Sequence, residues 1–192
     1  MLLSLLATLL LASTPAKPVA DIPPPMTNGV FIDKGACPGE ACALSGKLKW
    51  TQPVAVYDRP SSKARKIGAL RANEWVEVVA REFHMAPTRG VVREPNGQAE
   101  QLARGDVVYI IGYQGEGWVE LWRSGQRLSW AEPDIEANLA EIDWDTVSKT
   151  QPEPVMWVKV RRTKAASGWV RDFTNVRCGG QMDRDPDCPP LN

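Results

Sequence analysis

The sequence is poor in histidine, in cysteine and in net charge, and each shortage argues against a class of function. A single histidine, His84, leaves little scope for a metal site or for histidine-based catalysis. The 23 basic and 23 acidic residues cancel, so the basic surplus of nucleic-acid-binding proteins is missing. No apolar run reaches the ~20 residues of a membrane-spanning helix. We therefore expect no nucleic-acid partner, no cofactor or metal ion, and no membrane span in the mature chain.

The first sixteen residues have the pattern of a secretory signal peptide. An apolar run, Leu2–Leu11, precedes small residues and an A-x-A-like cleavage site that ends at Ala16. No basic residue precedes the run, which departs from the usual pattern, and a buried N-terminal helix is the alternative. We expect export, and a mature protein that is periplasmic or secreted.

Four cysteines follow this segment, and an even number in an exported chain is typical of disulfide bonds. Their spacing is not CxxC, so it indicates neither a redox pair nor a zinc ligand set. We expect two local disulfides, with a Pro-Gly turn inside the first; a bridge between the two pairs is the alternative. The predicted bonds are Cys37–Cys42 and Cys178–Cys188.

The rest of the chain reads as β-structure with one exception. Residues 17–33 hold four prolines and predict an extended leader with no core of its own. From Leu48 onward, short alternating runs are separated by turn residues, which is typical of a small sandwich or barrel. Within Pro133 to Ile142, however, apolar residues recur at helical spacing. This stretch predicts a short helical connector.

Three stretches resemble bacterial SH3-like domains. "PVAVYDRPSSKARKIGALRANEWVEVV" is similar to their opening half, with a Pro-Ser turn, an IGxL step and alternating valines. Asn73 stands where the family usually has glycine, a mild departure because asparagine tolerates positive φ. "WVKVRRTKAASGWVRD" resembles the closing hairpin, and "LARGDVVYIIGYQGEGWVELWRSG" looks like much of a second copy. The whole is similar to uncharacterised exported SH3-domain proteins of Gram-negative bacteria.

The resemblance implies an all-β fold of small SH3-like barrels in two copies, with the helical connector. The first copy lacks its closing hairpin until residue 156, so the barrels either follow in series or the second is inserted in the first. We favour insertion, because an open barrel edge is unfavourable. The predicted parts are the signal peptide (1–16), a Pro-rich leader and Cys loop (17–47), a first unit (48–85 with 155–175), a second unit (86–131), an acidic connector (132–154) and a Cys-containing tail (176–192).

No enzyme site emerges from the residues. A serine triad would need His84 as its base and a G-x-S-x-G elbow, which the sequence lacks. A cysteine nucleophile would need a thiol that the predicted disulfides consume. Counting does not exclude a pair of carboxylates, but small barrels seldom enclose a cleft deep enough to raise the pKa of one of them. We expect no catalytic residues and no enzymatic activity.

The eight tryptophans supply the strongest functional signal. In the predicted strand "WVELW" the two-residue period places Trp118, Glu120 and Trp122 on one face. Val119 and Leu121 lie on the other face and are the natural core members, so the indoles are expected to face solvent. The alternative is that these tryptophans are half-buried at the barrel rim.

The preceding strand adds two tyrosines to this surface. Tyr109 and Tyr113 alternate onto a common face, and the turn Gly115-Glu116-Gly117 is expected to bring their strand beside the tryptophan strand. An aromatic strip of this kind is suited to a sugar or to a proline-rich peptide. The predicted ligand-binding residues are Tyr109, Tyr113, Trp118, Glu120 and Trp122.

Charge is polarised locally, and the function hypotheses follow from the aromatic strip and this polarity. Residues 132–145 carry six acidic residues and no basic one, and residues 159–164 carry four basic residues. The basic run is read as a solvated turn, or as a contact for an anionic polymer or for the acidic segment.

We hypothesise an exported, non-catalytic SH3-like module that binds a peptide or a cell-wall component such as peptidoglycan. The alternatives are a secreted hydrolase, or an inhibitor of one that uses the acidic segment, and a structural protein of the cell envelope.

Overall fold

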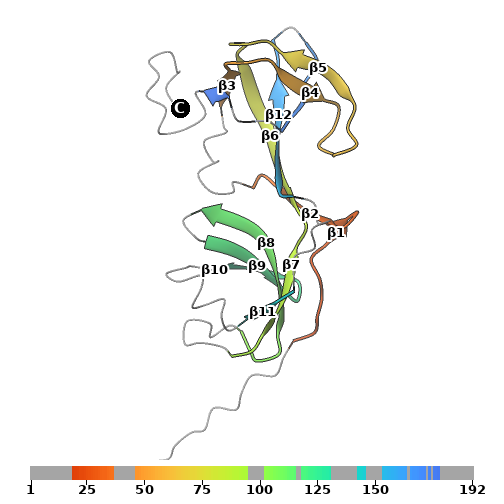
Figure 1. The fold of residues 1–192 in the computed structure, drawn as a ribbon, viewed down its shortest axis with the longest axis vertical. Helices are drawn as coiled ribbons and strands as arrows, with labels where there is room; N and C mark the ends of the chain where they lie inside the picture. The colour runs from red at the N-terminus through yellow and green to blue at the C-terminus, as the bar shows by residue number, and fades with distance from the viewer. Residues whose placement is uncertain are drawn as a thin grey trace, which may run out of the picture.

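The described part of the chain is all-β, as the sequence predicts. Its strands form two sheets stacked along the long axis of the molecule (Figure 1). None of the described residues lies in a helix, and so none forms a helix long and apolar enough to cross a membrane. The computed structural model describes residues 19–36, 46–94, 102–115, 118–130, 142–145, 153–163, 165–171, 173 and 175–177.

The larger sheet has nine strands. Seven are ordered β1-β2-β6-β12-β13-β4-β5, and β3 bonds both β6 and β14 beside this path. The strands are β1 (Met26–Thr27), β2 (Val30–Lys34), β3 (Lys47–Trp50), β4 (Val54–Tyr57), β5 (Lys66–Leu70), β6 (Val76–Met85), β12 (Val155–Arg161), β13 (Gly168–Val170) and β14 (Val176–Arg177).

The smaller sheet has five strands in the order β10-β9-β8-β7-β11, all antiparallel to their neighbours. Its strands are β7 (Thr88–Val92), β8 (Val107–Gly115), β9 (Trp118–Arg123), β10 (Gln126–Trp130) and β11 (Ile142–Trp144). They are consecutive in the chain, so the whole sheet lies between β6 and β12 in the sequence.

The chain leaves the larger sheet after β6 and returns to it at β12. β12 pairs with β6 from Val155 to Arg161, and β13 then pairs with both β12 and β4. Residues 155–170 therefore complete the sheet that residues 47–85 begin. β6 reaches from the upper sheet to the waist of the molecule, where β7 continues into the lower sheet (Figure 1).

Strand alternation builds the core of the larger sheet. Val54 and Val56 are buried on β4 while their neighbours are partly exposed. On β12 Val158 and Val160 are buried on either side of the partly exposed Lys159, and Trp157 is buried as well. A second cluster joins the two sheets, since Phe83 and Met85 at the end of β6 pack against residues of β8 and β9. The hydrophobic effect thus fixes the lower sheet to the end of β6.

Two turns have the backbone that their residues predict. Ser124 and Gly125 both have positive φ, 47° and 91°, as a two-residue hairpin between β9 and β10 requires. Asn73 has φ 59°, the left-handed conformation that asparagine tolerates better than most residues, at the predicted turn before β6. The strands predicted around these turns are present.

Part of the predicted leader is built into the larger sheet. Residues 26–34 form β1 and β2, and Phe31 on β2 is only 3% exposed. Pairing between β2 and β6 runs from Phe31 opposite Met85 to Lys34 opposite Glu82. The high proline content of residues 17–33 did not predict these strands. The prolines end at residue 25, and the apolar residues of β2 follow within the same stretch.

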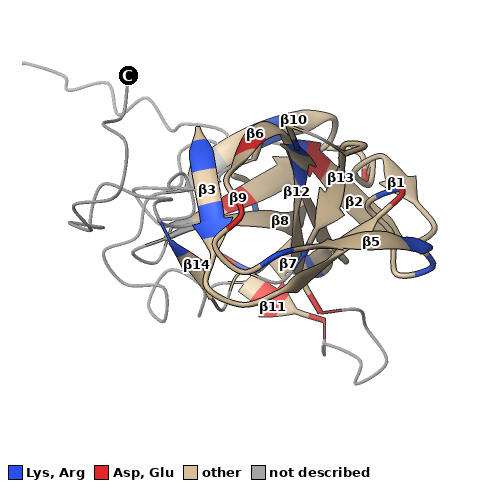
Figure 2. Cartoon of the chain, turned by 90° about the horizontal axis from the view of Figure 1, so that it is seen from above, with Lys and Arg blue, Asp and Glu red and all other residues tan. Residues whose placement is uncertain are grey.

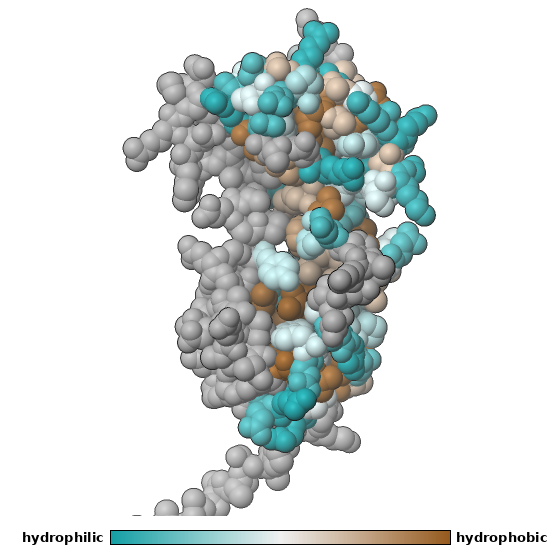
Figure 3. Space-filling model, in the orientation of Figure 1, coloured by the Kyte–Doolittle hydropathy of each residue, from teal (hydrophilic) through white to brown (hydrophobic). Residues whose placement is uncertain are grey.

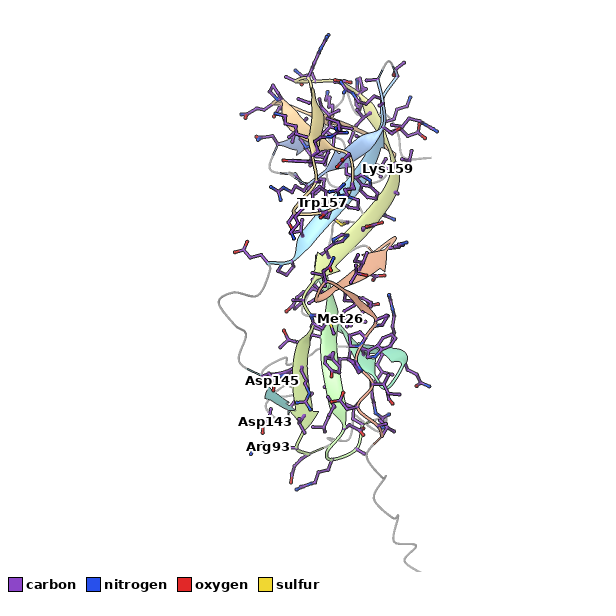
Figure 4. All side chains as sticks on the ribbon, turned by 90° about the vertical axis from the view of Figure 1, so that its right-hand side faces the viewer. Met26, Arg93, Asp143, Asp145, Trp157 and Lys159 are labelled. Atoms are coloured by element: carbon purple, nitrogen blue, oxygen red, sulfur yellow. The ribbon has the colours of Figure 1, made fainter. Side chains whose placement is uncertain are left out.

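The helical connector is not seen. Most of Pro133 to Ile142 lies outside the described residues, but Ile142 itself begins β11 and pairs with Val92. An apolar residue at this position fits a strand as well as a helix, because Ile142 is buried against other apolar residues of the lower sheet. Ion pairs of Arg93 with Asp143 and of Arg89 with Asp145 bind this edge (Figure 4).

Candidate functional site

The predicted aromatic surface lies on the five-stranded sheet. β8 and β9 are antiparallel neighbours, and Tyr109 stands directly opposite Trp122. Val119 and Leu121 are 3% and 1% exposed and belong to the cluster that joins the two sheets, which confirms their expected place in the core. We call the side with Tyr109 and Trp122 the outer face, and the side with Val119 and Leu121 the inner face.

A β-bulge separates the two tyrosines that were expected to share a face. The register shifts between Ile110 and Gly112, so Tyr113 stands opposite Val119 rather than on the strip with Trp122. Ile111, at the bulge, is fully buried and packs with Tyr109 on the outer face. Tyr113 is 46% exposed and does not lie on the strip that Tyr109 and Trp122 share.

The remaining two predicted residues lie on β9. Glu120 is partly buried against Gly112, and its carboxylate lies 3.7 Å from the guanidinium of Arg127 on β10. Trp118 begins the strand, and its side chain lies outside the described residues. The structure therefore brings together Tyr109, Glu120 and Trp122 from the predicted set.

The outer face is covered by the chain's own residues 19–25, which we call the N-terminal arm. Figure 1 shows it running down one edge of the lower sheet. The hydroxyl of Tyr109 donates a 2.8 Å hydrogen bond to the carboxylate of Asp21, and Arg89 donates to the same carboxylate at 3.4 Å. The indole Nε1 of Trp122 donates to the carbonyl of Ile22 at 2.9 Å.

The arm is also held at its start. The backbone N–H of Val19 donates to Oδ1 of Asp106 at 3.0 Å. Asp106 is fully buried; its Oδ2 accepts a 2.7 Å hydrogen bond from the N–H of Ala103 and lies 2.8 Å from the guanidinium of Arg123. This carboxylate therefore ties the arm to the base of β8.

Electrostatics match these contacts. Burial and then the hydrogen bond and charge of Asp21 raise the pKa of Tyr109, so its hydroxyl stays protonated and donates. Burial alone would lower the pKa of Arg89, but its hydrogen bond to Asp21 and the charges of Asp21 and Asp145 outweigh this and raise it. The outer face therefore presents fixed donors to an acidic group.

Aromatic packing extends the outer face toward β2. Phe31 lies 6.4 Å from Trp122 between ring centroids, and Arg127 lies over the Phe31 ring at 5.3 Å. Both carboxylate oxygens of Asp33 accept hydrogen bonds from Arg127, at 2.9 and 3.1 Å, and the hydrogen bond to Asp33 is the main reason that the pKa of Arg127 is raised. The face is thus rigid on the side of β2 and β10.

A hollow lies at the far end of the larger sheet, between the turn before β6 and the loop after β12. Its volume is about 630 Å³. Glu74 accepts two hydrogen bonds from Arg162, at 2.8 and 3.0 Å, and this pairing lowers the pKa of Glu74. Trp75 is 38% exposed there, with the ammonium of Lys49 5.0 Å from its ring centroid. The lining residues are Arg71, Ala72, Asn73, Glu74, Trp75, Arg162, Thr163 and Ala165.

The basic run 159–164 does not form a free cationic tip where it is described. Arg162 is paired with Glu74, and Arg161 forms an ion pair with Glu77. Lys159 lies over the ring of Trp169, 5.9 Å from its centroid. Seen from above, basic residues also mark β3 in this part of the molecule (Figure 2). Local acids therefore neutralise both arginines of the run.

Several other tryptophans act as packing residues. Trp50, Trp157 and Trp169 are buried, and Trp157 makes an edge-on contact with Tyr57 at 5.7 Å between centroids. Arg171 covers both of these rings (Figure 4 labels Trp157 on β12). Figure 3 shows that polar residues dominate the two ends of the molecule, with apolar residues between them. Burial thus removes these three indoles from the candidate binding surface.

The one histidine of the chain lies on β6 of the larger sheet. His84 bonds Glu82 at 2.9 Å and packs against Trp157. Among the described residues, no three His, Cys, Asp or Glu side chains are grouped so as to hold a metal ion. The four cysteines lie outside the described residues.

Comparison with known proteins gives no relative. No family model, no curated protein and no solved structure matches the chain.

Sequence reasoning missed the arm and the groups that hold it. Asp21, Arg89 and Asp106 carry no recognisable motif, and each meets its partner only after the sheet has formed. One signal was present in the run "DIPPP", because three consecutive prolines impose an extended polyproline II backbone that suits an aromatic surface.

Proposed function

We propose that this protein is an exported, non-catalytic binding module for a peptide or a peptidoglycan component, with the outer face as its peptide site. The observation that carries the proposal is the seating of the N-terminal arm. An extended segment lies on Tyr109 and Trp122, and both the side chain of Asp21 and the backbone of Ile22 are hydrogen-bonded. A surface that binds one extended segment in this way has the donors needed for recognising another.

The hollow beside Trp75 is the candidate site for a cell-wall sugar. It combines a partly exposed indole with a paired carboxylate and guanidinium, and such groups bind sugars by stacking and by hydrogen bonds. The return of β12 and β13 to the first sheet supports two SH3-like units, the second inserted in the first. A hydrolase, a hydrolase inhibitor and a structural envelope protein remain the competing proposals.

Two matched variants of the full chain test the two sites. We would titrate soluble peptidoglycan fragments, which contain both peptide and sugar, into the wild type, Trp122→Ala and Trp75→Ala. If peptide binds on the outer face, the affinity for the fragments should fall at least tenfold in Trp122→Ala alone. If sugar binds in the hollow, the affinity should fall by that factor in Trp75→Ala alone. Each variant is the control for the other. Absence of binding at millimolar fragment, both by the wild type and by Asp21→Ala, in which a contact of the arm is removed, would contradict the proposal, and fragment cleavage would favour the hydrolase.

Export predicts oxidised cysteines. Each disulfide removes two hydrogens, so four cysteines in two disulfides leave the chain four hydrogens lighter in a mass spectrum taken without reduction. Reduction before the measurement is the control. A reduced, zinc-loaded chain would contradict both the disulfides and the proposed compartment.

A further inference from the structure

The N-terminal arm shows a three-residue period on the outer face. The carboxylate of Asp21 is bound by Tyr109 and Arg89, and Pro24, three positions later, is buried. The intervening Ile22 is 50% exposed, and Pro23 is exposed as well. Positions three apart lie on one side of a polyproline II helix, the conformation that three consecutive prolines favour. The contacts of Asp21 and the burial of Pro24 fit such a helix with one side toward the sheet.

Each contacted position has a distinct chemistry. Position 21 needs an anionic side chain, because a hydroxyl and a guanidinium both donate to it. Position 22 is recognised through its backbone carbonyl, which accepts from Trp122, so its side chain is not selected. Position 24 is recognised by burial of a proline. The pattern that the surface selects is Asp-x-x-Pro.

We infer that the outer face is a receptor for polyproline II peptides of the pattern Asp-x-x-Pro, and that the arm occupies it as a displaceable ligand in cis. The inference rests on the proposed binding function and names its peptide class. The partner is an extended, proline-rich segment with an acidic residue three positions before the buried proline. The charge of Arg89 complements that acid.

The exposure of the arm makes displacement feasible. The side chain of Asp21 is 40% exposed and that of Arg89 is 37% exposed, so water can replace their contact as the arm leaves. Segments with few buried apolar contacts open locally at far lower free energy than a core. A segment tethered in cis acts at an effective concentration on the order of millimolar, so an external peptide of equal affinity competes poorly.

The test weakens the arm in the full chain and supplies its sequence from outside. The variant is Asp21→Ala with Pro24→Ala, and the probe is a capped synthetic peptide of residues 19–25 followed by calorimetry. We expect the variant to bind the peptide at least tenfold more tightly than the wild type, whose site is already occupied. The matched control is Ile22→Ala with Pro25→Ala, which changes two exposed arm positions and should behave as the wild type.

Peptide and receptor changes test the stated pattern. In the arm-weakened variant, peptides with Asp21→Asn or Pro24→Ala should bind at least tenfold more weakly than the unchanged peptide, and one with Ile22→Ala should bind equally. Adding Arg89→Ala to the protein should reduce the preference for aspartate over asparagine. A folded variant that does not bind the peptide at several millimolar, or binds all peptides alike, would overturn the inference.

A second measurement applies if the arm-weakened variant does not fold. In the wild type, the indole N–H of Trp122 should exchange with solvent much faster than core amides such as that of Leu121, because the arm opens locally. Exchange of that indole only through global unfolding would overturn a displaceable arm. If the synthetic peptide binds but peptidoglycan fragments do not, the inference stands while the fragment-binding proposal fails; the reverse result rejects the inference alone.

Discussion

The two faces of the five-stranded sheet are built from different chemistry. On the inner face Ile110, Val119 and Leu121 are aliphatic, and they meet Phe83 and Met85 from the other sheet. The outer face also buries apolar side chains, Ile111 and Phe31, but it adds a hydroxyl, an indole N–H and a guanidinium, which belong to Tyr109, Trp122 and Arg89. Aliphatic side chains accept any apolar neighbour of the right volume, whereas buried polar groups require partners with matching donors and acceptors.

This difference separates a core from a recognition surface. The inner face is closed mainly by apolar side chains, and the sulfurs of Met85 and Met156 and the indole nitrogen of Trp144 are the exceptions among the residues packed there. Its stabilisation therefore grows with the apolar area buried. The outer face is covered by the N-terminal arm. The carboxylate of Asp21 accepts a hydrogen bond from Tyr109, and the carbonyl of Ile22 accepts one from Trp122. Only the outer face therefore specifies the chemistry of what covers it.

The largest predicted effect comes from Asp106, where the arm meets the base of β8. Asp106→Ala should destabilise the protein by about 3–5 kcal/mol, because it leaves the guanidinium of Arg123 and the N–H of Ala103 without their acceptor. Urea unfolding of the variant and the wild type measures the loss. Asp143→Ala, which removes an exposed ion-pair partner, is the control and should cost less than about 1 kcal/mol. Equal costs would contradict the role of burial.

The next effect tests the inner face. Leu121→Ala should cost about 3 kcal/mol, because it opens a cavity in a cluster where the leucine is 1% exposed. Binding of the synthetic arm peptide by an arm-weakened form of this variant should be unchanged under conditions where it is folded. Thermal melting and calorimetry measure the two quantities. A small loss of stability with lost binding would mean that the faces are assigned in reverse.

Trp122→Ala tests the outer face and should cost less, about 1–2 kcal/mol. The indole is partly exposed, and its removal loses one hydrogen bond to Ile22 and one aromatic contact with Phe31. The same thermal melts provide the comparison with Leu121→Ala. Unfolding that is far easier in Trp122→Ala than in Leu121→Ala would show that the outer face is a core instead of a recognition surface.

The inner face was predictable from the sequence because it depends on a local rule. Alternation along "WVELW" places Val119 and Leu121 together whatever the partner strand does. The outer face depends on two features that no local pattern marks. The bulge near Ile111 changes the side on which Tyr113 lies. The hydrogen bond between Asp21 of the arm and Tyr109 joins residues that are 88 positions apart in the chain. Register shifts and long-range polar pairs arise from the assembled sheet, so they required the structure.

The smallest predicted effect compares Asp106 with a more accessible acid, Glu74 in the hollow. Its hydrogen bond to Arg162 lowers its pKa below the ordinary value of 4.5. A lowered folded pKa gives stability that is present above the unfolded pKa and is lost as pH falls through the folded pKa. Glu74→Gln should therefore lower the melting temperature by at most about 4 °C at neutral pH, and the difference should shrink as the pH falls below 4.5.

Thermal melts of Glu74→Gln and the wild type at about pH 7 and about pH 3 measure this difference. The control is Asp58→Asn, since Asp58 also pairs with arginines but lies outside the hollow. If Glu74→Gln lowers the melting temperature as much at the acidic pH as at the neutral pH, the glutamate stabilises the fold through its shape and not through its charge. A deficit confined to neutral pH would show that Glu74, whose side chain is 23% exposed, contributes modestly through its charge, whereas removal of the fully buried Asp106 is expected to cost about 3–5 kcal/mol. Burial, and not the presence of opposite charges, then separates the two carboxylates.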